Sequence, residues 1–205
     1  DAFFGPLFDG SAFQDLPRSG EPLAVQYWPI HENWPIPFAE AYRFKPSTDA
    51  WPLNLAEHMR KAAPVGREFT ETATKAHEAI VREFVKHAAG KGWSRTMFQY
   101  FLNDKRQFTK GKLGWWNLDE PQHMEDFLAN RWFGLRYKTA LASLPEEVRK
   151  RVQSEFRLDV SRPQWMRDWL DGVADLLVAS SAIDEKPTRI REMMTRRKFR
   201  FYRYG

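Results

Sequence analysis

Two acidic residues and a proline end a short aromatic segment, Gly114-Trp115-Trp116-Asn117-Leu118-Asp119-Glu120-Pro121. We interpret the aromatic run as a buried strand that stops at Asp119 and Glu120. Pro121 fixes the chain direction after them and disfavours a helical backbone at Glu120. Aromatic surroundings raise the pKa of one carboxyl group while its neighbour stays ionised, so the pair suits acid/base chemistry.

The same triplet has a purely structural interpretation. Asp119 can be the N-cap of a helix that has Pro121 in its first turn, because Asp is a favoured N-cap and proline is favoured at the first helical position. The triplet alone does not decide between an acid/base pair and a helix N-cap, so other segments of the chain have to be considered.

Polar residues also follow other segments that we expect to be strands or turns. The candidate ligand-binding groups among them are Asp9, Glu32, Asn33, Asn103, Asp104 and Asp159, with Trp34 as an aromatic neighbour. Several have a structural alternative. Asp9 can cap the turn at Gly10, Glu32 and Asn33 can form a polar turn between two prolines, and Asp104 can form a surface ion pair with Lys105 or Arg106.

Strands and helices are expected to alternate along the chain. Besides the run that ends at Asp119, the expected strands are residues 23–28, 96–102, 155–160, 175–181 and 199–204. The expected helices are residues 68–89, 122–143, 146–153, 165–173 and 187–198.

This alternation predicts an α/β fold with a parallel sheet. No expected strand is followed by a glycine-rich loop of the dinucleotide- or phosphate-binding kind. Candidate residues at several strand ends are typical of a (β/α)8 TIM barrel, whose site lies at the carboxyl ends of its strands. Because we count only about six strand–helix steps, we expect an incomplete barrel from the C-terminal portion of a longer catalytic domain, with residues 1–205 as one domain.

Composition narrows the classes of protein that remain. The 205 residues are 42% hydrophobic and 15% aromatic, which is typical of a globular protein with an aromatic core or a pocket for flat apolar faces. Without cysteine the chain has no disulfide, thiolate nucleophile or cysteine zinc site. The histidines lack metal-ligand spacing and no apolar run approaches a membrane span, so we expect no metal, no cofactor and no membrane partner.

Three short motifs resemble glycoside hydrolase family 123 and the glycosidase-like domains related to it. They are Asp-Gly-Ser-Ala-Phe at residues 9–13, Pro-Ile-His-Glu-Asn-Trp-Pro at residues 29–35 and Asp-Glu-Pro at residues 119–121. The resemblance implies a TIM barrel, a secreted or periplasmic location and exo-hydrolysis of β-linked N-acetylgalactosamine. It also implies that Glu120 is the general acid, and then the general base, of a substrate-assisted retaining mechanism.

The resemblance gives the remaining candidates their roles. Asp119 would hold the N–H group of the substrate's 2-acetamido group, whose carbonyl oxygen attacks the anomeric carbon to form an oxazolinium intermediate. Glu32 and Asn33 would bind sugar hydroxyls and Trp34 would stack on a ring. The family also implies a tyrosine near the acetamido group, for which the candidates are Tyr27, Tyr100 and Tyr202.

Three other functions remain open at this stage. A conventional retaining glycosidase would use Glu120 as acid/base and Glu32 or Asp159 as nucleophile, and a non-catalytic carbohydrate-binding barrel would use the same pocket. The basic aromatic end, residues 196–204, resembles a single-stranded nucleic-acid site, although a helix end followed by an alternating strand explains it better. We therefore expect a carbohydrate substrate and no nucleic acid.

Overall fold

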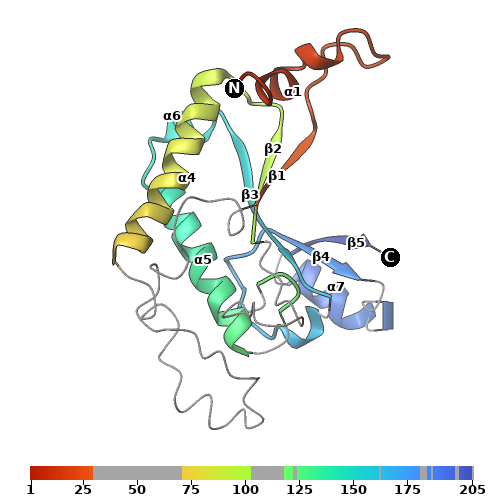
Figure 1. The fold of residues 1–205 in the computed structure, drawn as a ribbon. Helices are drawn as coiled ribbons and strands as arrows, with labels where there is room; N and C mark the ends of the chain where they lie inside the picture. Colours follow the sequence, from red (N-terminus) through yellow and green to blue (C-terminus); the bar gives the residue numbers. More distant parts are fainter. Residues whose placement is uncertain are drawn as a thin grey trace, which may run out of the picture.

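The computed structural model describes residues 1–29, 71–102, 118–121, 124–161, 163–180, 184–185, 187–196 and 199–204. They contain a five-stranded parallel sheet (Figure 1). Its strands are β1 (Val25–Pro29), β2 (Met97–Phe101), β3 (Gln153–Asp159), β4 (Leu176–Ser180) and β5 (Arg200–Tyr204). The order across the sheet equals the order along the chain, so neighbouring strands are also consecutive in sequence.

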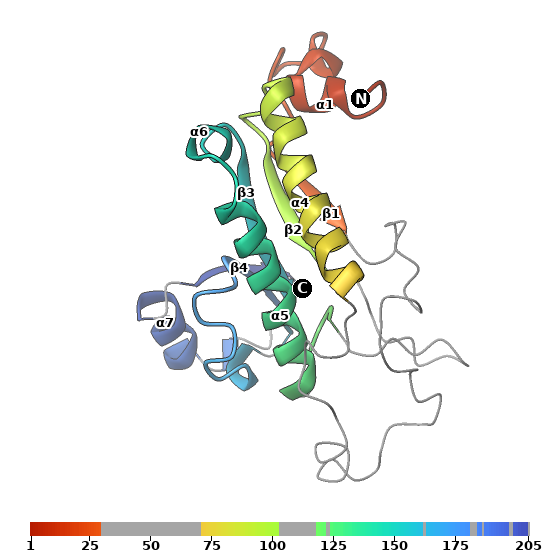
Figure 2. The same ribbon diagram turned by 90° about the vertical axis from the view of Figure 1, so that its left-hand side faces the viewer.

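Helices connect consecutive strands. The short helix α1 (Gly5–Asp9) and the 3-10 helix η1 (Ser11–Phe13) precede β1. Helix α4 (Glu71–Lys91) leads into β2, and α5 (Met124–Ala142) and α6 (Glu146–Arg149) lead into β3. The 3-10 helix η2 (Pro163–Trp165) lies between β3 and β4, and α7 (Pro187–Thr195) lies between β4 and β5. Figure 2 shows α4 and α5 side by side against the sheet.

The hydrophobic core lies between the sheet and these helices. Along β3, Phe156 and Leu158 are fully buried and belong to the same apolar cluster as Phe133 of α5 and Met193 of α7. The residues that alternate with them along the strand, Glu155, Arg157 and Asp159, lie on the opposite face. One face of the sheet is therefore apolar and covered by helices, and the other carries the polar side chains of β3 beside aromatic and aliphatic neighbours such as Phe101 and Leu176. We call this second face the polar face.

A second apolar cluster covers the amino-terminal ends of the first strands. Phe8 of α1 contacts Trp93 and Phe98 with ring centroids 4.9 and 5.1 Å apart. The last turns of α4 contribute Val85 and Ala88 to this cluster, and the helix ends where Gly92 has φ 73° and the Trp93 N–H donates to the Ala88 carbonyl. The left-handed conformation at such a position is readily adopted by glycine and ends many helices.

Most of the expected elements are confirmed. All five described strands overlap the expected ones, and the expected helices at 68–89, 122–143 and 187–198 correspond to α4, α5 and α7. The expected helix over residues 165–173 is wrong: η2 ends at Trp165 and turns follow, with φ 52° at Arg167 interrupting any helical path. The expected helix over 146–153 is shorter, because α6 ends at Arg149 and β3 already begins at Gln153. The α/β class is thus established, with a parallel sheet.

Among the described residues, no helix combines the length and apolar character that crossing a membrane requires.

Candidate functional site

Residues 118–121 lie at the carboxyl end of β3. The buried side chain of Leu118 belongs to the main apolar cluster, and its carbonyl oxygen accepts a 3.2 Å hydrogen bond from Asn130 of α5. Two residues later, the Glu120 N–H donates to the carbonyl oxygen of Asp159, the last residue of β3, at 2.9 Å. These two contacts fasten Asp119 and Glu120 to the edge of the sheet where the strands end.

The backbone turns sharply at Glu120. Its φ is 63°, a left-handed conformation that non-glycine residues rarely adopt. Asp119 therefore does not cap a helix directly, because neither Glu120 nor Pro121 is helical. The turn also breaks the regular alternation that would send adjacent strand side chains to opposite faces.

The two carboxyl groups have different environments. Asp119 is buried, with 7% of the residue exposed, whereas Glu120 is half-buried. The Ser161 hydroxyl donates to Glu120 Oε1 at 2.9 Å. Ser161 lies just past β3, and its own carbonyl oxygen accepts a 3.0 Å hydrogen bond from the Ser180 hydroxyl at the end of β4.

Asp159 forms a two-point ion pair on the polar face of the sheet. Arg157 Nε donates to Asp159 Oδ1 at 2.9 Å and its Nη2 donates to Oδ2 at 3.1 Å. The guanidinium also lies 4.1 Å from the centroid of the Tyr27 ring and 4.8 Å from that of Phe101. Burial alone would lower the pKa of Arg157, but the hydrogen bonds that Arg157 donates to Asp159 and Tyr27, together with the charges of those groups, outweigh burial and raise the pKa.

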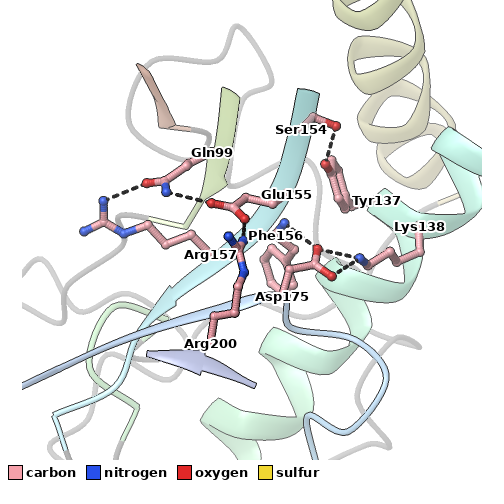
Figure 3. Close-up of polar contacts among 9 residues, drawn as sticks. All are labelled: Gln99, Tyr137, Lys138, Ser154, Glu155, Phe156, Arg157, Asp175 and Arg200. Atoms are coloured by element: carbon pink, nitrogen blue, oxygen red, sulfur yellow. Dashed lines mark hydrogen bonds and ion pairs between the residues drawn. The ribbon is translucent and has the colours of Figure 1, made fainter. Parts of the chain in front are cut away.

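A polar network continues from this ion pair across the sheet (Figure 3). Arg157 Nη1 donates to Gln99 Oε1 at 3.1 Å, and Gln99 Nε2 donates to Glu155 Oε1 at 2.8 Å. Glu155 also forms an ion pair with Arg200, which comes from β5. Buried charges are costly unless they are paired and hydrogen-bonded, and each charge in this network has a partner of opposite sign.

The structure brings together only some of the predicted site residues. Asp119, Glu120 and Asp159 lie at the same edge of the sheet, whereas Asp9 ends α1 at the opposite, amino-terminal edge (Figure 1). Asp9 Oδ1 accepts the Ser11 N–H at 2.8 Å, and hydrogen bonding to Ser11 lowers its pKa, as expected for a carboxylate that stabilises a turn. The remaining predicted residues lie outside the described ranges: Glu32, Asn33, Trp34, Asn103 and Asp104.

The three candidate tyrosines lie in different surroundings. Tyr100 is fully buried on the helix-covered face, where its hydroxyl is hydrogen-bonded to His77 Nε2. Tyr27 and Tyr202 are exposed, the former stacked on Arg157 near the polar network and the latter on the outer strand β5. Among the contacts between described residues, the one from Tyr27 to Arg157 thus joins a candidate tyrosine to the site.

Two of the histidines are described. His77 is buried in the core, and burial, with a smaller effect of the Arg136 charge, lowers its pKa to about 3. His87 is half-exposed and pairs with Asp1 at 2.7 Å. Within the described ranges, no group of three or more His, Asp or Glu side chains is arranged to hold a metal ion.

Two residues of the site were not singled out in the sequence. Ser161 carries a usable signal, because it comes directly after the expected strand 155–160 and thus at the functional edge of a parallel sheet. Arg157 carries a weaker signal: it alternates with apolar residues in that strand, so a polar face is expected but not the identity of its partner.

Two cavities are formed by described residues. One of about 580 Å³ is bounded by aromatic side chains of α1, β1 and α4, including Phe8, Trp28 and Phe84. Another of about 550 Å³ lies beside the loop before β1, between Phe13, Leu23 and Arg95. Neither includes a residue of the 118–121 segment.

Searches of protein-family models, of curated proteins and of solved structures found no match to this chain.

Proposed function

We propose that this chain is part of a glycoside hydrolase that releases β-linked N-acetylhexosamine, most specifically N-acetylgalactosamine, by a substrate-assisted retaining mechanism. One observation carries the proposal: two consecutive carboxyl groups are fastened at the carboxyl end of a parallel strand, one buried and one half-buried with a hydroxyl partner. Acid/base sites in parallel α/β folds are built at this end of the strands.

The strand order supports a barrel as the complete architecture. Parallel strands in sequential order, with helices on one face, are the arrangement from which a (β/α)8 barrel is built. The polar face of the sheet would then face the barrel interior, where paired charges such as Arg157 and Asp159 fill the space between strands. In this proposal the described sheet is the larger part of an incomplete barrel.

Each acid has one task in the proposed reaction. Glu120 donates its proton to the glycosidic oxygen as the bond to the leaving group breaks, while the acetamido carbonyl oxygen bonds to the anomeric carbon. Asp119 accepts a hydrogen bond from the acetamido N–H and stabilises the positive oxazolinium ion. Glu120, now ionised, takes a proton from water as the water oxygen attacks the anomeric carbon and opens the oxazolinium ring. This step regenerates the acid and releases the sugar.

The adjacency of the acids favours substrate assistance over a conventional nucleophile. When the substrate supplies its own nucleophile, no second carboxylate is needed across the sugar ring. A conventional retaining enzyme needs a carboxylate free to attack, and both oxygens of Asp159 accept hydrogen bonds from Arg157. That pairing reduces the nucleophilicity of Asp159 and supports a binding or positioning role for it.

The test is hydrolysis of 4-nitrophenyl β-N-acetylgalactosaminide and its glucosamine counterpart by the full chain. Glu120→Gln and Asp119→Asn are each expected to lower kcat by about 10²–10⁴-fold, the usual contribution of a positioned acid or base. Asp9→Asn is the matched control, because Asp9 lies at the opposite edge of the sheet and its loss leaves kcat unchanged.

An inhibitor separates the mechanisms. A thiazoline analogue of the oxazoline intermediate is expected to inhibit hydrolysis, because it mimics a species formed only in the substrate-assisted route. Hydrolysis that the thiazoline does not inhibit would point to the conventional retaining mechanism. Sugar binding without hydrolysis, retained in Glu120→Gln, would identify a carbohydrate-binding protein.

A further inference from the structure

Ser161 makes the contact that orients the Glu120 side chain. Its hydroxyl group donates to Glu120 Oε1 at 2.9 Å, and both residues are half-buried. A hydrogen bond to one carboxyl oxygen restricts rotation of the whole group, so it also fixes the direction in which the second oxygen faces.

Ser161 is itself held by the neighbouring strand. The Val160 N–H donates to the Val178 carbonyl oxygen at 2.8 Å, and the Ser180 hydroxyl donates to the Ser161 carbonyl oxygen at 3.0 Å. The end of β3 is thus tied to the end of β4 on both sides of the Cα atom of Ser161. A donor fixed in this way can hold a carboxyl group in one orientation.

The main chain of Glu120 is held by the same short segment. Its left-handed conformation is unfavourable for a residue other than glycine, so it persists only where other contacts enforce it. The Glu120 N–H donates to the Asp159 carbonyl oxygen, two residues before Ser161. Residues 159–161 therefore hold both the backbone and the carboxyl group of Glu120.

We propose that Ser161, locked by Ser180, is a positioning residue for Glu120 and helps it to act as the general base in the second half of the reaction. The catalytic part of this inference rests on the proposed function; the carboxyl-orienting part does not. A hydroxyl donor stabilises the ionised carboxylate, which is the form that must wait for the incoming water. Charged groups near Glu120 in the described part of the chain include Asp119, Asp159 and Arg157, the partner of Asp159.

The first experiment measures Glu120 directly, without relying on activity. The full chain is labelled with ¹³C at glutamate side chains, and the Glu120 carboxyl signal is identified by its loss in Glu120→Gln. Because hydrogen bonds to charged groups are worth about 1.5–3 kcal/mol, Ser161→Ala is expected to raise the pKa of Glu120 by about one unit or more. Ser161→Thr keeps the hydroxyl and is expected to restore the original value.

Two further variants control for general effects on folding. Ser154→Ala removes a hydroxyl that is hydrogen-bonded to Tyr137 at 2.7 Å near the other end of β3, so it is expected to leave the titration of Glu120 unchanged. Ser180→Ala leaves the Ser161 hydroxyl in place but removes its anchor, so a smaller rise in the pKa is expected. If neither Ser161→Ala nor Ser180→Ala shifts the titration of Glu120, the positioning role is wrong.

The second experiment measures hydrolysis and separates the two proposals. Ser161→Ala is expected to lower kcat by about 10-fold or more with little change in KM, and Ser161→Thr to recover most of it. Active wild-type protein with an unchanged kcat in Ser161→Ala would overturn the catalytic role while the proposed function stands. A shifted Glu120 titration in a chain that hydrolyses no glycoside would overturn the proposed function while the positioning contact stands.

Discussion

The two faces of the sheet are built from alternating residues of the same strands, yet they differ in how they are stabilised. In β3, Phe156 and Leu158 enter the apolar core, while Glu155 and Arg157 join a polar network on the other face (Figure 3). All four are buried. Burial therefore does not distinguish the faces. The helix-covered face depends on shape and packing, and the polar face depends on each charge keeping its partner.

The difference predicts different sensitivities. An apolar face tolerates substitutions that conserve volume, but it responds to a steric clash. On a polar face, the loss of even one charged partner is strongly destabilising, because the remaining charge stays buried without compensation. The following substitutions test each of these statements.

The largest effect is expected on the polar face. Arg157→Ala removes both donors to Asp159 and the donor to Gln99, and it should lower the free energy of unfolding by about 3–5 kcal/mol. Urea denaturation monitored by tryptophan fluorescence measures the change. The matched control is Arg18→Ala, which breaks an exposed ion pair with Glu21 and should have little measurable effect. A similar loss in both variants would show that the network is not a special source of stability.

A slightly smaller effect is expected on the helix-covered face, at Gly134 of α5. A Cβ atom there would lie far inside contact distance of Val173 Cγ1 and of the Phe156 ring. Gly134→Ala should therefore cost about 2–3 kcal/mol of unfolding free energy, although alanine is the better helix former. Gly90→Ala is the control in α4, where nothing lies within 4 Å of a new Cβ atom, and it should be neutral or stabilising. Equal stability of the two variants would contradict the close packing of α5 on β3.

The smallest effect concerns a polar group within the apolar face. The pKa of buried His77 is about 3 in the folded protein and near 6.5 in the unfolded chain. The contribution of neutral His77 to the free energy of unfolding is therefore fully present only above about pH 6.5. That contribution is lost as the pH falls from about 6.5 towards 3, and it should amount to about 2 kcal/mol between pH 7 and pH 5. Denaturation at several pH values measures the slope. His77→Gln stays neutral and should show a flatter dependence, whatever its absolute stability; an unchanged slope would exclude His77 as the source.

The sequence predicted the parts of this structure that depend on periodicity. Apolar alternation located β3, and the helical spacing of Ala76, Ile80, Phe84 and Ala88 located α4. The stretch after η2 was predicted incorrectly as a helix because its apolar spacing is helical, while the backbone takes turns and φ 52° at Arg167. Such a turn depends on tertiary contacts, including the hydrogen bonds from Arg131 of α5 to the carbonyl oxygens of Trp169 and Asp171.

The candidate site was predicted less completely than the fold. Asp119 and Glu120 were noticed because two acids and a proline end an aromatic run, and strand position alone brought Asp159 to the same edge. The hydrogen bond from Ser161 joins residues 41 positions apart, and no local pattern specifies such a partner. Arg157 and Asp159 are two positions apart and share a strand face by alternation, but alternation does not specify that they pair with each other. Asp9 was grouped with the site on motif evidence, and only the packing of α1 shows that it lies at the other edge.

The sequential order of the strands bears on how the protein is made. Each strand pairs with its immediate predecessor, so a growing chain can add one strand and one helix at a time to the edge already formed. Within the described part of the chain, no strand has to be inserted between two others after they have paired. Strand β5, at one side of the described sheet, carries Arg200 and Arg203, which pair with Glu155 and Asp184. Charged residues on a strand at the side of a sheet discourage pairing with strands of other molecules.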